Sequence, residues 1–421
     1  MTPRGFEAPW VITGKPGEAP LREAAVVFDD AGRVLAVGPK GDLHRAHAGL
    51  SWTRVEGILM PGLVNAHVHL ELSALRGHTR SGGGFGPWVA SMMAKRQELS
   101  PEQDLEAIDA AVSELLAAGT VAVGEVTNSL ASLDALRTAP LLGRVFHEVF
   151  GMRRETAQVM RGLAEQAYAQ QPAFPPHLSY CLAPHTLYSL HPRSVQELVA
   201  SARERAQRTS LHLSEHAAER AFLRDGGGPF AAFLALRQVD PADWDPPGVS
   251  PVAYAKQLGV LGPDVIAVHL CATEREELVE VARAKAPSVL CPRSNLFIEL
   301  KLPPLYDILD AGLRPGLGTD SLASNTTLDV LAEAAALSDR FPTVDKGVLV
   351  SMATFHGAEA LGLSHRVGAL APGLAPGLLA VELANPVADP LRHVLRSPPP
   401  KRRVLVRPAM PTEARPMGET P

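Results

Sequence analysis

Residues 58–69 read ILMPGLVNAHVH, and this apolar run with a histidine pair at its end decides how the rest of the chain is interpreted. The run has the composition of a buried strand. Alternate strand residues point to the same side, so the imidazoles of His67 and His69 face one way. Neutral imidazole is the commonest protein ligand for zinc and related metals, and two rings supply half of a tetrahedral ligand set. The remaining ligands must come from elsewhere in the chain.

The composition narrows the class of protein. The chain has 421 residues, 46% of them hydrophobic, with 40 basic and 45 acidic side chains for a net charge of −5. This length exceeds that of one compact core, so we expect one large domain with a smaller annex. No basic run is longer than residues 401–403, which argues against a nucleic-acid partner. Three cysteines, Cys181, Cys271 and Cys291, are too few for a disulfide framework or a thiolate zinc site.

The N-terminus lacks the basic and apolar segments of a signal peptide. The chain also has no uncharged apolar stretch of about 18 residues, the length needed to span a membrane. We therefore expect a soluble cytoplasmic protein without a membrane partner. Its expected partner is a small-molecule substrate, and the sequence leaves homo-oligomerisation open.

From residue 58 onward, short apolar or β-branched runs alternate with amphipathic stretches, which is typical of strand and helix units around a parallel sheet. Eight such runs can be counted, at 58–69, 121–127, 144–150, 178–186, 210–216, 265–272, 288–295 and 314–320. Helices of the outer ring are expected at 101–118, 192–207 and 274–285. Because eight parallel strands close a barrel, the sequence predicts an α/β fold with a (β/α)8 TIM-like barrel.

Both ends of the chain have a different pattern, with short strands separated by turns. Residues 24–28 and 34–37 have the pattern of a hairpin, and the segment after residue 367 is again rich in turns and strand-like runs. We expect residues 1–57 and 365–407 to form a small β-sandwich beside a barrel of residues 58–364. Residues 408–421 are expected to be a disordered tail.

Two long insertions, at residues 70–98 and 217–263, follow predicted barrel strands. Barrel active sites are built from loops at the C-terminal ends of the strands, so we expect both insertions to be functional. They carry the aromatic residues Phe85, Trp88 and Trp244. These side chains either pack beneath a loop or form a wall of the substrate site.

Polar and ionisable side chains gather at the predicted C-terminal ends of the barrel strands. They are His67, His69, Glu125, His147, Glu148, His185, His212, Glu215, His269 and Asp320. Several lie inside apolar runs, where burial without a partner is costly. A metal ion removes that cost. Three imidazoles and one carboxylate, from His67, His69, His212 and Asp320, complete a ligand set for one divalent ion, Zn²⁺ in the first place and Fe²⁺ in the second.

Four strings of the sequence resemble the amidohydrolase superfamily in its mononuclear aminohydrolase branch; they are PGLVNAHVHLELSALRG, HLSEH, VIAVHL and GLGTDSLASN. The resemblance extends to about Gly377. It implies metal ligands at His67, His69, His212 and Asp320, a proton-shuttling glutamate at Glu215, and a water-orienting histidine at His269. Asp320 would also accept a proton from the attacking water.

Two other metal-dependent branches fit the sequence poorly. Binuclear amidohydrolases carry a carboxylated lysine at the fourth strand, and residues 178–185 contain no lysine. Zinc deaminases with a Pro-Cys-x-x-Cys motif need a second cysteine that does not follow Cys291-Pro292. One metal ion per chain is therefore expected.

The reaction that the resemblance implies is hydrolytic deamination, in which activated water attacks a ring carbon and ammonia leaves. The motifs resemble those of deaminases of adenine nucleosides with a modified 5′ side. Aminofutalosine (6-amino-6-deoxyfutalosine) deaminases rank first, and S-adenosylhomocysteine or methylthioadenosine deaminases second. Guanine deamination, removal of chlorine from a triazine and a non-catalytic scaffold are the alternatives.

Other residues have two alternative roles each. His185 occupies the position of a substrate-contacting histidine in these relatives, and its alternative role is to cap or pack before the helix at Pro192. Arg153, Arg154 and Arg293 either bind substrate or lie on the solvated surface.

Overall fold

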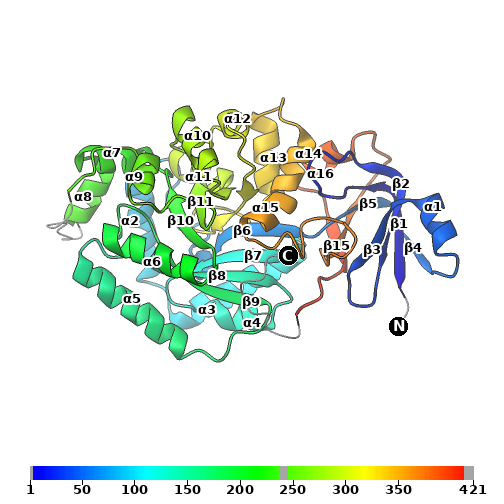
Figure 1. Cartoon of the computed structure of the whole chain (residues 1–421), viewed down its shortest axis with the longest axis horizontal. Coiled ribbons are helices and arrows are strands. Elements are labelled where there is room, and N and C mark those ends of the chain that lie inside the picture. Colours follow the sequence, from blue (N-terminus) through cyan, green and yellow to red (C-terminus); the bar gives the residue numbers. More distant parts are fainter. Residues whose placement is uncertain (1–2, 237–244, 412–421) are drawn as a thin grey trace.

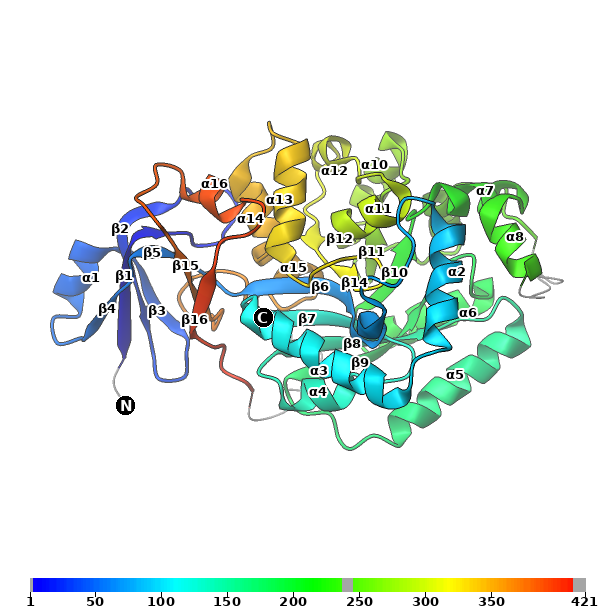
Figure 2. The same ribbon diagram turned by 180° about the vertical axis from the view of Figure 1, so that it is seen from behind.

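The computed structural model describes residues 3–236 and 245–411. In this part of the chain, parallel strands wrapped by helices form one body, and a smaller sheet lies beside it at one end of the elongated molecule (Figure 1 and, from behind, Figure 2). Trp244 and residues 412–421 of the predicted tail lie outside the described residues. Met410, also in the predicted tail, packs against the barrel core.

The strands of the barrel follow the chain in order. Within the described residues they are β6 (Leu63–His69), β7 (Thr120–Thr127), β8 (Leu142–Val149), β9 (Leu178–Pro184), β10 (Thr209–Leu213), β11 (Val265–His269), β12 (Ser288–Leu290), β13 (Gly316–Leu317) and β14 (Asp320–Ser321). All neighbouring pairs are parallel. A bridge between Thr186 and His212 joins the end of β9 to β10, and β14 pairs with β6. β13 and β14 both correspond to the eighth predicted run, 314–320, so the eight runs form a closed ring, which confirms the predicted (β/α)8 barrel.

Closure requires a close approach of the first and last strands. A Cβ atom at Gly318 would lie 2.6 Å from the Cβ of His67, so only glycine fits between β13 and β14. The side-chain amide of Asn65 donates to Thr319 Oγ1 at 2.7 Å, and its oxygen accepts from the Thr319 N–H at 3.1 Å. These contacts set the register between the strand that carries His67 and the strand that begins at Asp320.

Most helices cover the outside of the barrel (Figure 1). Those that follow the barrel strands or cover them are α3 (Pro101–Ala117), α4 (Leu133–Thr138), α5 (Arg154–Ala169), α6 (Pro192–Glu204), α9 (Pro251–Gln257), α10 (Arg275–Arg283), α12 (Leu305–Asp310), α13 (Val330–Arg340), α14 (Lys346–Met352) and α15 (Phe355–Ala360). The predicted helices at 101–118, 192–207 and 274–285 correspond to α3, α6 and α10. α3 begins where predicted because Ser100 and Gln103 form a capping box around Pro101.

The two predicted insertions are largely helical and lie at the C-terminal end of the barrel strands. The first holds the 3₁₀ helix η1 (Leu70–Leu75) and α2 (Phe85–Arg96), and the second holds α7 (Ala217–Asp225) and α8 (Gly228–Leu236) before α9. Among the described residues, no helix combines the length and the apolar composition that crossing a bilayer requires.

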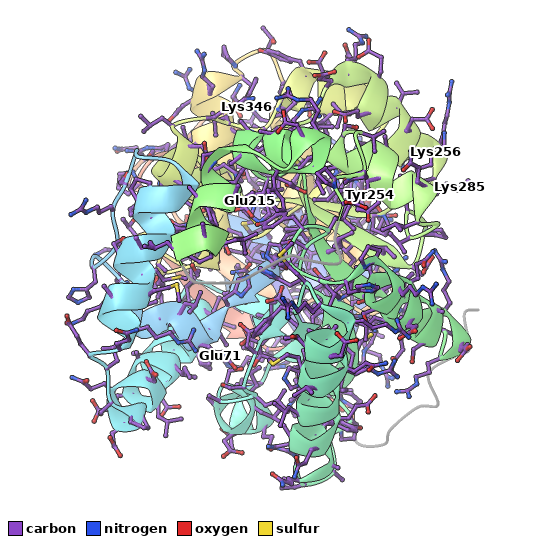
Figure 3. The ribbon with its side chains drawn as sticks, turned by 90° about the vertical axis from the view of Figure 1, so that its left-hand side faces the viewer. Glu71, Glu215, Tyr254, Lys256, Lys285 and Lys346 are labelled. Carbon is purple, nitrogen blue, oxygen red and sulfur yellow. The ribbon has the colours of Figure 1, made fainter. Side chains whose placement is uncertain are left out.

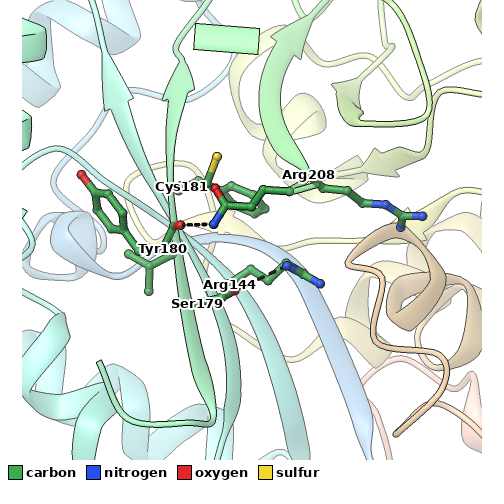
Figure 4. A pocket seen from close by; sticks show the side chains of 8 residues that line it. Arg144, Ser179, Tyr180, Cys181 and Arg208 are labelled. Atoms are coloured by element: carbon green, nitrogen blue, oxygen red, sulfur yellow. Dashed lines mark hydrogen bonds between the residues drawn. The ribbon is translucent and has the colours of Figure 1, made fainter. Parts of the chain in front are cut away.

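Two arginines occupy the opposite, N-terminal end of the barrel. Arg144 of β8 donates to the carbonyl of Leu361, and Arg208, just before β10, donates to the carbonyls of Glu359 and Ala360, the latter at 2.9 Å. Both side chains reach toward the end of α15 from either side of β9 (Figure 4). Carbonyls at a helix C-terminus lack intrahelical donors, so these contacts satisfy them. This end of the barrel is therefore held by structural hydrogen bonds.

The small sheet draws strands from both ends of the chain. Its order is β16-β15-β5-β1-β2-β3, with β4 paired to β1. The strands are β1 (Arg4–Val11), β2 (Leu21–Phe28), β3 (Val34–Pro39), β4 (Trp52–Arg54), β5 (Gly57–Met60), β15 (Leu378–Glu382) and β16 (Arg402–Val406). Phe6, Phe28, Leu59, Leu378 and Val406 share its core. The short helices α1 (Lys40–Ala46) and α16 (Pro390–Val394) accompany it.

Two predicted strands differ from the structure. The run 58–69 contains two strands, because Pro61 lacks an N–H for pairing; β5 joins the small sheet and β6 the barrel. The run 288–295 ends as a strand at Leu290, and α11 (Pro292–Glu299) follows. Proline is favoured in the first turn of a helix, which explains the early start of α11. Ser294 and Asn295 therefore lie on a helix rather than on a strand.

Candidate active site

The four predicted ligands lie together at the C-terminal end of the barrel. His67 and His69 come from β6, His212 from β10 and Asp320 from β14. The ring centroid of His67 lies 4.9 Å from that of His69 and 4.9 Å from that of His212. Asp320 Oδ1 lies 3.4 Å from His69 Nε2 and 3.8 Å from His67 Nε2. Three separate strands thus bring these side chains to one point.

The chemistry of this cluster fits a metal ion. Ligand atoms of His67, His69 and His212 lie within 4.8 Å of one another. His67 is 1% exposed, and its Nε2 has no hydrogen-bond partner among the described residues, an arrangement that is costly without a ligand. Burial, with the neighbouring His212 and His69, holds the pKa of His67 well below its usual value. The ring is therefore neutral, with a lone pair for a metal.

Further groups contact the residues of the cluster and orient them. His212 Nδ1 lies 3.2 Å from Glu148 Oε1 and 3.2 Å from the carbonyl of His185, which leaves Nε2 for another partner. Burial of Glu148 opposes its charge, but His185 and His212 lower its pKa to about 2. The Glu148 carboxylate is therefore ionised where it faces the His212 ring.

Asp320 is oriented in a similar way. Ser294 and Ser324 donate hydrogen bonds to Oδ2 of Asp320, at 2.5 and 2.9 Å. The other oxygen, Oδ1, faces the two histidines of β6. Ser294 reaches Asp320 from the first turn of α11, which is why the helical start at Pro292 matters for the site.

Glu215 and His269 lie beside this cluster. Glu215 lies near the middle of the barrel end, whereas Lys256 and Lys285 lie at the outer edge (Figure 3). His269 Nε2 is 3.6 Å from Glu215 Oε2 and, like His67 Nε2, has no hydrogen-bond partner in the described part of the chain. Burial lowers the pKa of His269 to about 4. Burial of Glu215 opposes ionisation, but His216 and His269 hold its pKa well below the usual value. The site thus pairs an ionised carboxylate with a neutral imidazole.

The backbone is left-handed at four non-glycine residues where the strands end. The φ angles are 51° at Ser214, 77° at His269, 49° at Leu270 and 56° at Asp320. Such conformations cost about 1–3 kcal/mol each and are retained where the surrounding structure enforces them. Their concentration next to Glu215, His269 and Asp320 is typical of a functional site.

The predicted substrate residues lie around the cluster. His185 follows β9, with its ring 5.1 Å from that of His212 and its Nδ1 2.8 Å from Ser189 Oγ. The alternative role of His185 as a helix cap is wrong, because His191 caps α6. Phe85 and Trp88 lie in the first turns of α2; the ring of Phe85 is 4.2 Å from that of Phe230, and Trp88 Nε1 donates to Ala323 O at 2.9 Å.

Other predicted polar residues have structural partners instead. Glu125 accepts a hydrogen bond from Ser132 Oγ at 2.7 Å, and burial raises its pKa well above the usual value. His147 lies between Tyr180 Oη and the carbonyl of Asn128, at 3.0 and 3.1 Å. These groups surround the site without joining the cluster.

The three arginines have different surroundings. Arg154 pairs with Glu197 at 2.8 Å. Arg293 donates to Asn325 Oδ1 and Thr326 Oγ1, at 3.1 and 2.7 Å, and so holds the loop after β14. Arg153 directly precedes α5.

Sequence reasoning missed Glu71, which is 7% exposed and saturated with hydrogen bonds (labelled in Figure 3). It accepts from the N–H groups of Asn128 and Ser129 at 2.9 and 3.0 Å, from Ser129 Oγ at 2.8 Å and from the hydroxyl of Thr127. A carboxylate between two leucines, two residues after the histidine pair, was the available signal. His216, Glu219 and Glu299 near Glu215 were missed as well.

The comparison with known families agrees with this geometry. Residues 58–406 match the model of the amidohydrolase family. The chain belongs to the amidohydrolase family. The match covers the barrel and reaches the last strand of the small sheet, so the histidine pair, Glu215, His269 and Asp320 all lie within it.

The chain is similar to deaminases both in sequence and in fold. The chain is 28% identical over 337 residues to aminodeoxyfutalosine deaminase of Deinococcus radiodurans, covering 78% of this chain and 79% of the relative. It is 30% identical over 374 residues to 5-methylthioadenosine/S-adenosylhomocysteine deaminase of Natronomonas pharaonis, covering 84% and 80%. A crystal structure of an adenosine deaminase from Xanthomonas campestris with bound zinc superposes with a TM-score of 0.77 at 23% identity, covering 96% of this chain and 92% of that one.

Proposed function

We propose that the protein is a metal-dependent hydrolytic deaminase of an adenine nucleoside with a modified 5′ side, with 6-amino-6-deoxyfutalosine as the first-ranked substrate. The observation that carries this proposal is the set of buried, converging groups at one end of the barrel. His67 Nε2 and His269 Nε2 have no partner among the described residues, and the ionised Glu215 lies beside His269. The names of the relatives support the substrate class.

The residues that would hold the metal are His67, His69, His212 and Asp320. Three imidazoles and one carboxylate suit one Zn²⁺ ion in the first place and Fe²⁺ in the second. The Xanthomonas structure contains bound zinc. A bound ion would supply Lewis acidity and bring the pKa of a water molecule toward neutrality.

The side chains around this point have separate tasks in the proposed reaction. His269 orients the attacking water through Nε2, and Asp320 accepts one of the two protons of that water. Glu215 is ionised before the reaction, so it first takes up the other proton of that water and then delivers it to a ring nitrogen, which makes the amino-bearing carbon electrophilic. The C–O bond forms, the C–N bond breaks, and the amine leaves as ammonia after Asp320 passes it the second proton.

Aromatic residues of the two insertions, with Tyr188 between β9 and α6, supply a wall for the 5′ side of the nucleoside. Phe85 of α2 contacts Phe230 of α8, and Tyr188 stacks on Phe230 with ring centroids 4.1 Å apart. Binding energy from a group remote from the reacting carbon contributes to stabilisation of the transition state. Trimming the 5′ group is therefore expected to lower kcat/KM by more than about tenfold.

The test is a substrate panel with the zinc-loaded protein. Ammonia release is measured from aminofutalosine, S-adenosylhomocysteine, methylthioadenosine, adenosine and guanine, and chloride release from a chlorotriazine. The proposal expects the highest kcat/KM for aminofutalosine, then for the two sulfur-containing nucleosides. Fastest turnover of guanine or of the triazine would refute the nucleoside assignment.

A further inference from the structure

His216 lies between two carboxylates next to the proposed proton-transfer group. It is 1% exposed, with its Nε2 3.3 Å from Glu215 Oε1 and its Nδ1 2.9 Å from Glu299 Oε1. Burial opposes a charge on the ring, but Glu215 and Glu299 raise the pKa of His216 to about 10. Both ring nitrogens therefore carry hydrogens, and each donates to a different carboxylate.

The two oxygens of Glu215 consequently have different surroundings. Oε1 faces His216, whereas Oε2 faces His269 at 3.6 Å. The backbone N–H of Glu215 donates to Glu219 Oε2 at 2.8 Å, which fixes the main chain at the same point. One oxygen of Glu215 is thus restrained, and the other is presented to the centre of the site.

The His216 ring is itself held in place. The rings of Phe85 and Phe230 flank it, with centroids 5.3 and 6.0 Å away. Glu299 ends α11, and the N–H of Gly84, directly before α2, donates to Ile298 O at 2.9 Å. α2, α8 and α11 therefore all contact the His216–Glu299 pair or its immediate neighbours.

We propose that His216 is a positioning residue for Glu215, with Glu299 as its anchor, and that the Nε2 contact sets the orientation in which Glu215 transfers protons. This inference rests on the proposed function, because it assigns its role through the reaction of Glu215. His216 is not one of the proposed metal ligands, and it acts on the reaction only through Glu215.

Two amide substitutions separate the two contacts of the ring. In His216→Gln the amide nitrogen lies near the position of Nε2 and keeps a donor for Glu215. In His216→Asn it lies near Nδ1 and keeps a donor for Glu299 only. We expect His216→Gln to retain kcat within about tenfold and His216→Asn to lose on the order of 10²-fold, the typical effect of a misplaced catalytic group. KM and metal content are expected to stay unchanged in both.

The controls test the anchor and the general effect of removing a histidine. Glu299→Gln keeps an acceptor oxygen for Nδ1 and is expected to be milder than Glu299→Ala. His177→Asn, on the outside of the barrel, removes a histidine that contacts Leu136 O and is expected to leave kcat unchanged. Equal kcat in His216→Gln and His216→Asn, whether high or low, would overturn the proposal, as would a change confined to KM.

A second measurement does not depend on any substrate. Crystal structures of the zinc-loaded wild type and His216→Asn should show Glu215 Oε2 beside His269 in the first and the carboxylate rotated away in the second. An unchanged Glu215 in His216→Asn would overturn the inference even if no nucleoside is turned over. Failure of the wild type on the whole substrate panel would instead refute the proposed function.

Discussion

Ligand atoms of Glu215, His269 and Asp320 lie within 4.8 Å of one another, and their neighbours distinguish the roles that we propose for them. Glu215 faces His216 and His269, both outside the proposed ligand set. Glu215→Gln keeps the shape of the side chain but cannot carry a proton. We expect this variant to retain its metal by elemental analysis and to lose about 10²-fold or more in turnover. Loss of metal from Glu215→Gln would reassign Glu215 as a ligand.

His269 and His212 have similar rings, 5.3 Å apart, but different supports. His212 is backed by the Glu148 carboxylate, as metal-binding histidines commonly are, whereas His269 Nδ1 is 3.4 Å from the Asn295 amide. We expect His212→Ala to lose metal and His269→Ala to retain metal while losing turnover. The same metal content per chain in the two variants would contradict this division of roles.

At the scale of elements, Glu71 joins η1 to the loop after β7. The same loop reaches the site, because Asn128 Nδ2 donates to Glu148 Oε2 at 3.2 Å and Glu148 faces His212. Replacing Glu71 by alanine leaves the buried hydroxyl of Thr127 and the partly buried N–H groups of Asn128 and Ser129 without this acceptor. We expect Glu71→Ala to lower the free energy of unfolding by about 3 kcal/mol, as measured by urea denaturation.

The same substitution should also weaken metal binding at the proposed site. Disturbed support of a ligand typically weakens metal binding by about 10- to 100-fold, which competition with a chelator would measure in Glu71→Ala. Glu102→Ala, in the exposed first turn of α3, is the matched control and should change neither property. Normal metal affinity in a destabilised Glu71→Ala would show that the hydrogen bonds of Glu71 stabilise the fold without supporting the proposed metal site.

At the scale of the whole molecule, the proposed ligands come from β6, β10 and β14 and therefore link the barrel strands across their open end. We expect about one tightly bound metal ion per chain by elemental analysis. Since an ion that binds only the folded state stabilises it, zinc at 100 times its Kd should add about 2.7 kcal/mol. Chelation should lower Tm reversibly. Two tightly held ions per chain, or a Tm that does not respond to chelation, would contradict a single structural and catalytic metal.

Sequence alone was sufficient where the signal is local and periodic. The two-residue period of a strand places His67 and His69 on one side, and the alternation of apolar runs with amphipathic helices predicts the barrel. It was insufficient at residues 288–295, where apolar composition suggested a strand but Pro292 begins a helix. The strand break at Pro61, which divides one apolar run between two sheets, was missed for the same reason. The composition of a run does not show at which residue the chain leaves one sheet and joins another.

Only the tertiary structure decided how the polar groups are paired. The contacts of His212 with Glu148, of Asp320 with Ser294, and of His216 with Glu299 join residues far apart in the chain. They depend on the closed ring of strands, whose register is set where Gly318 passes His67. The sequence therefore determined which side chains reach the C-terminal end of the barrel, because strand direction and period are local properties. Which atoms of those side chains meet was decided by barrel closure, because the register between distant strands is contained in no local pattern.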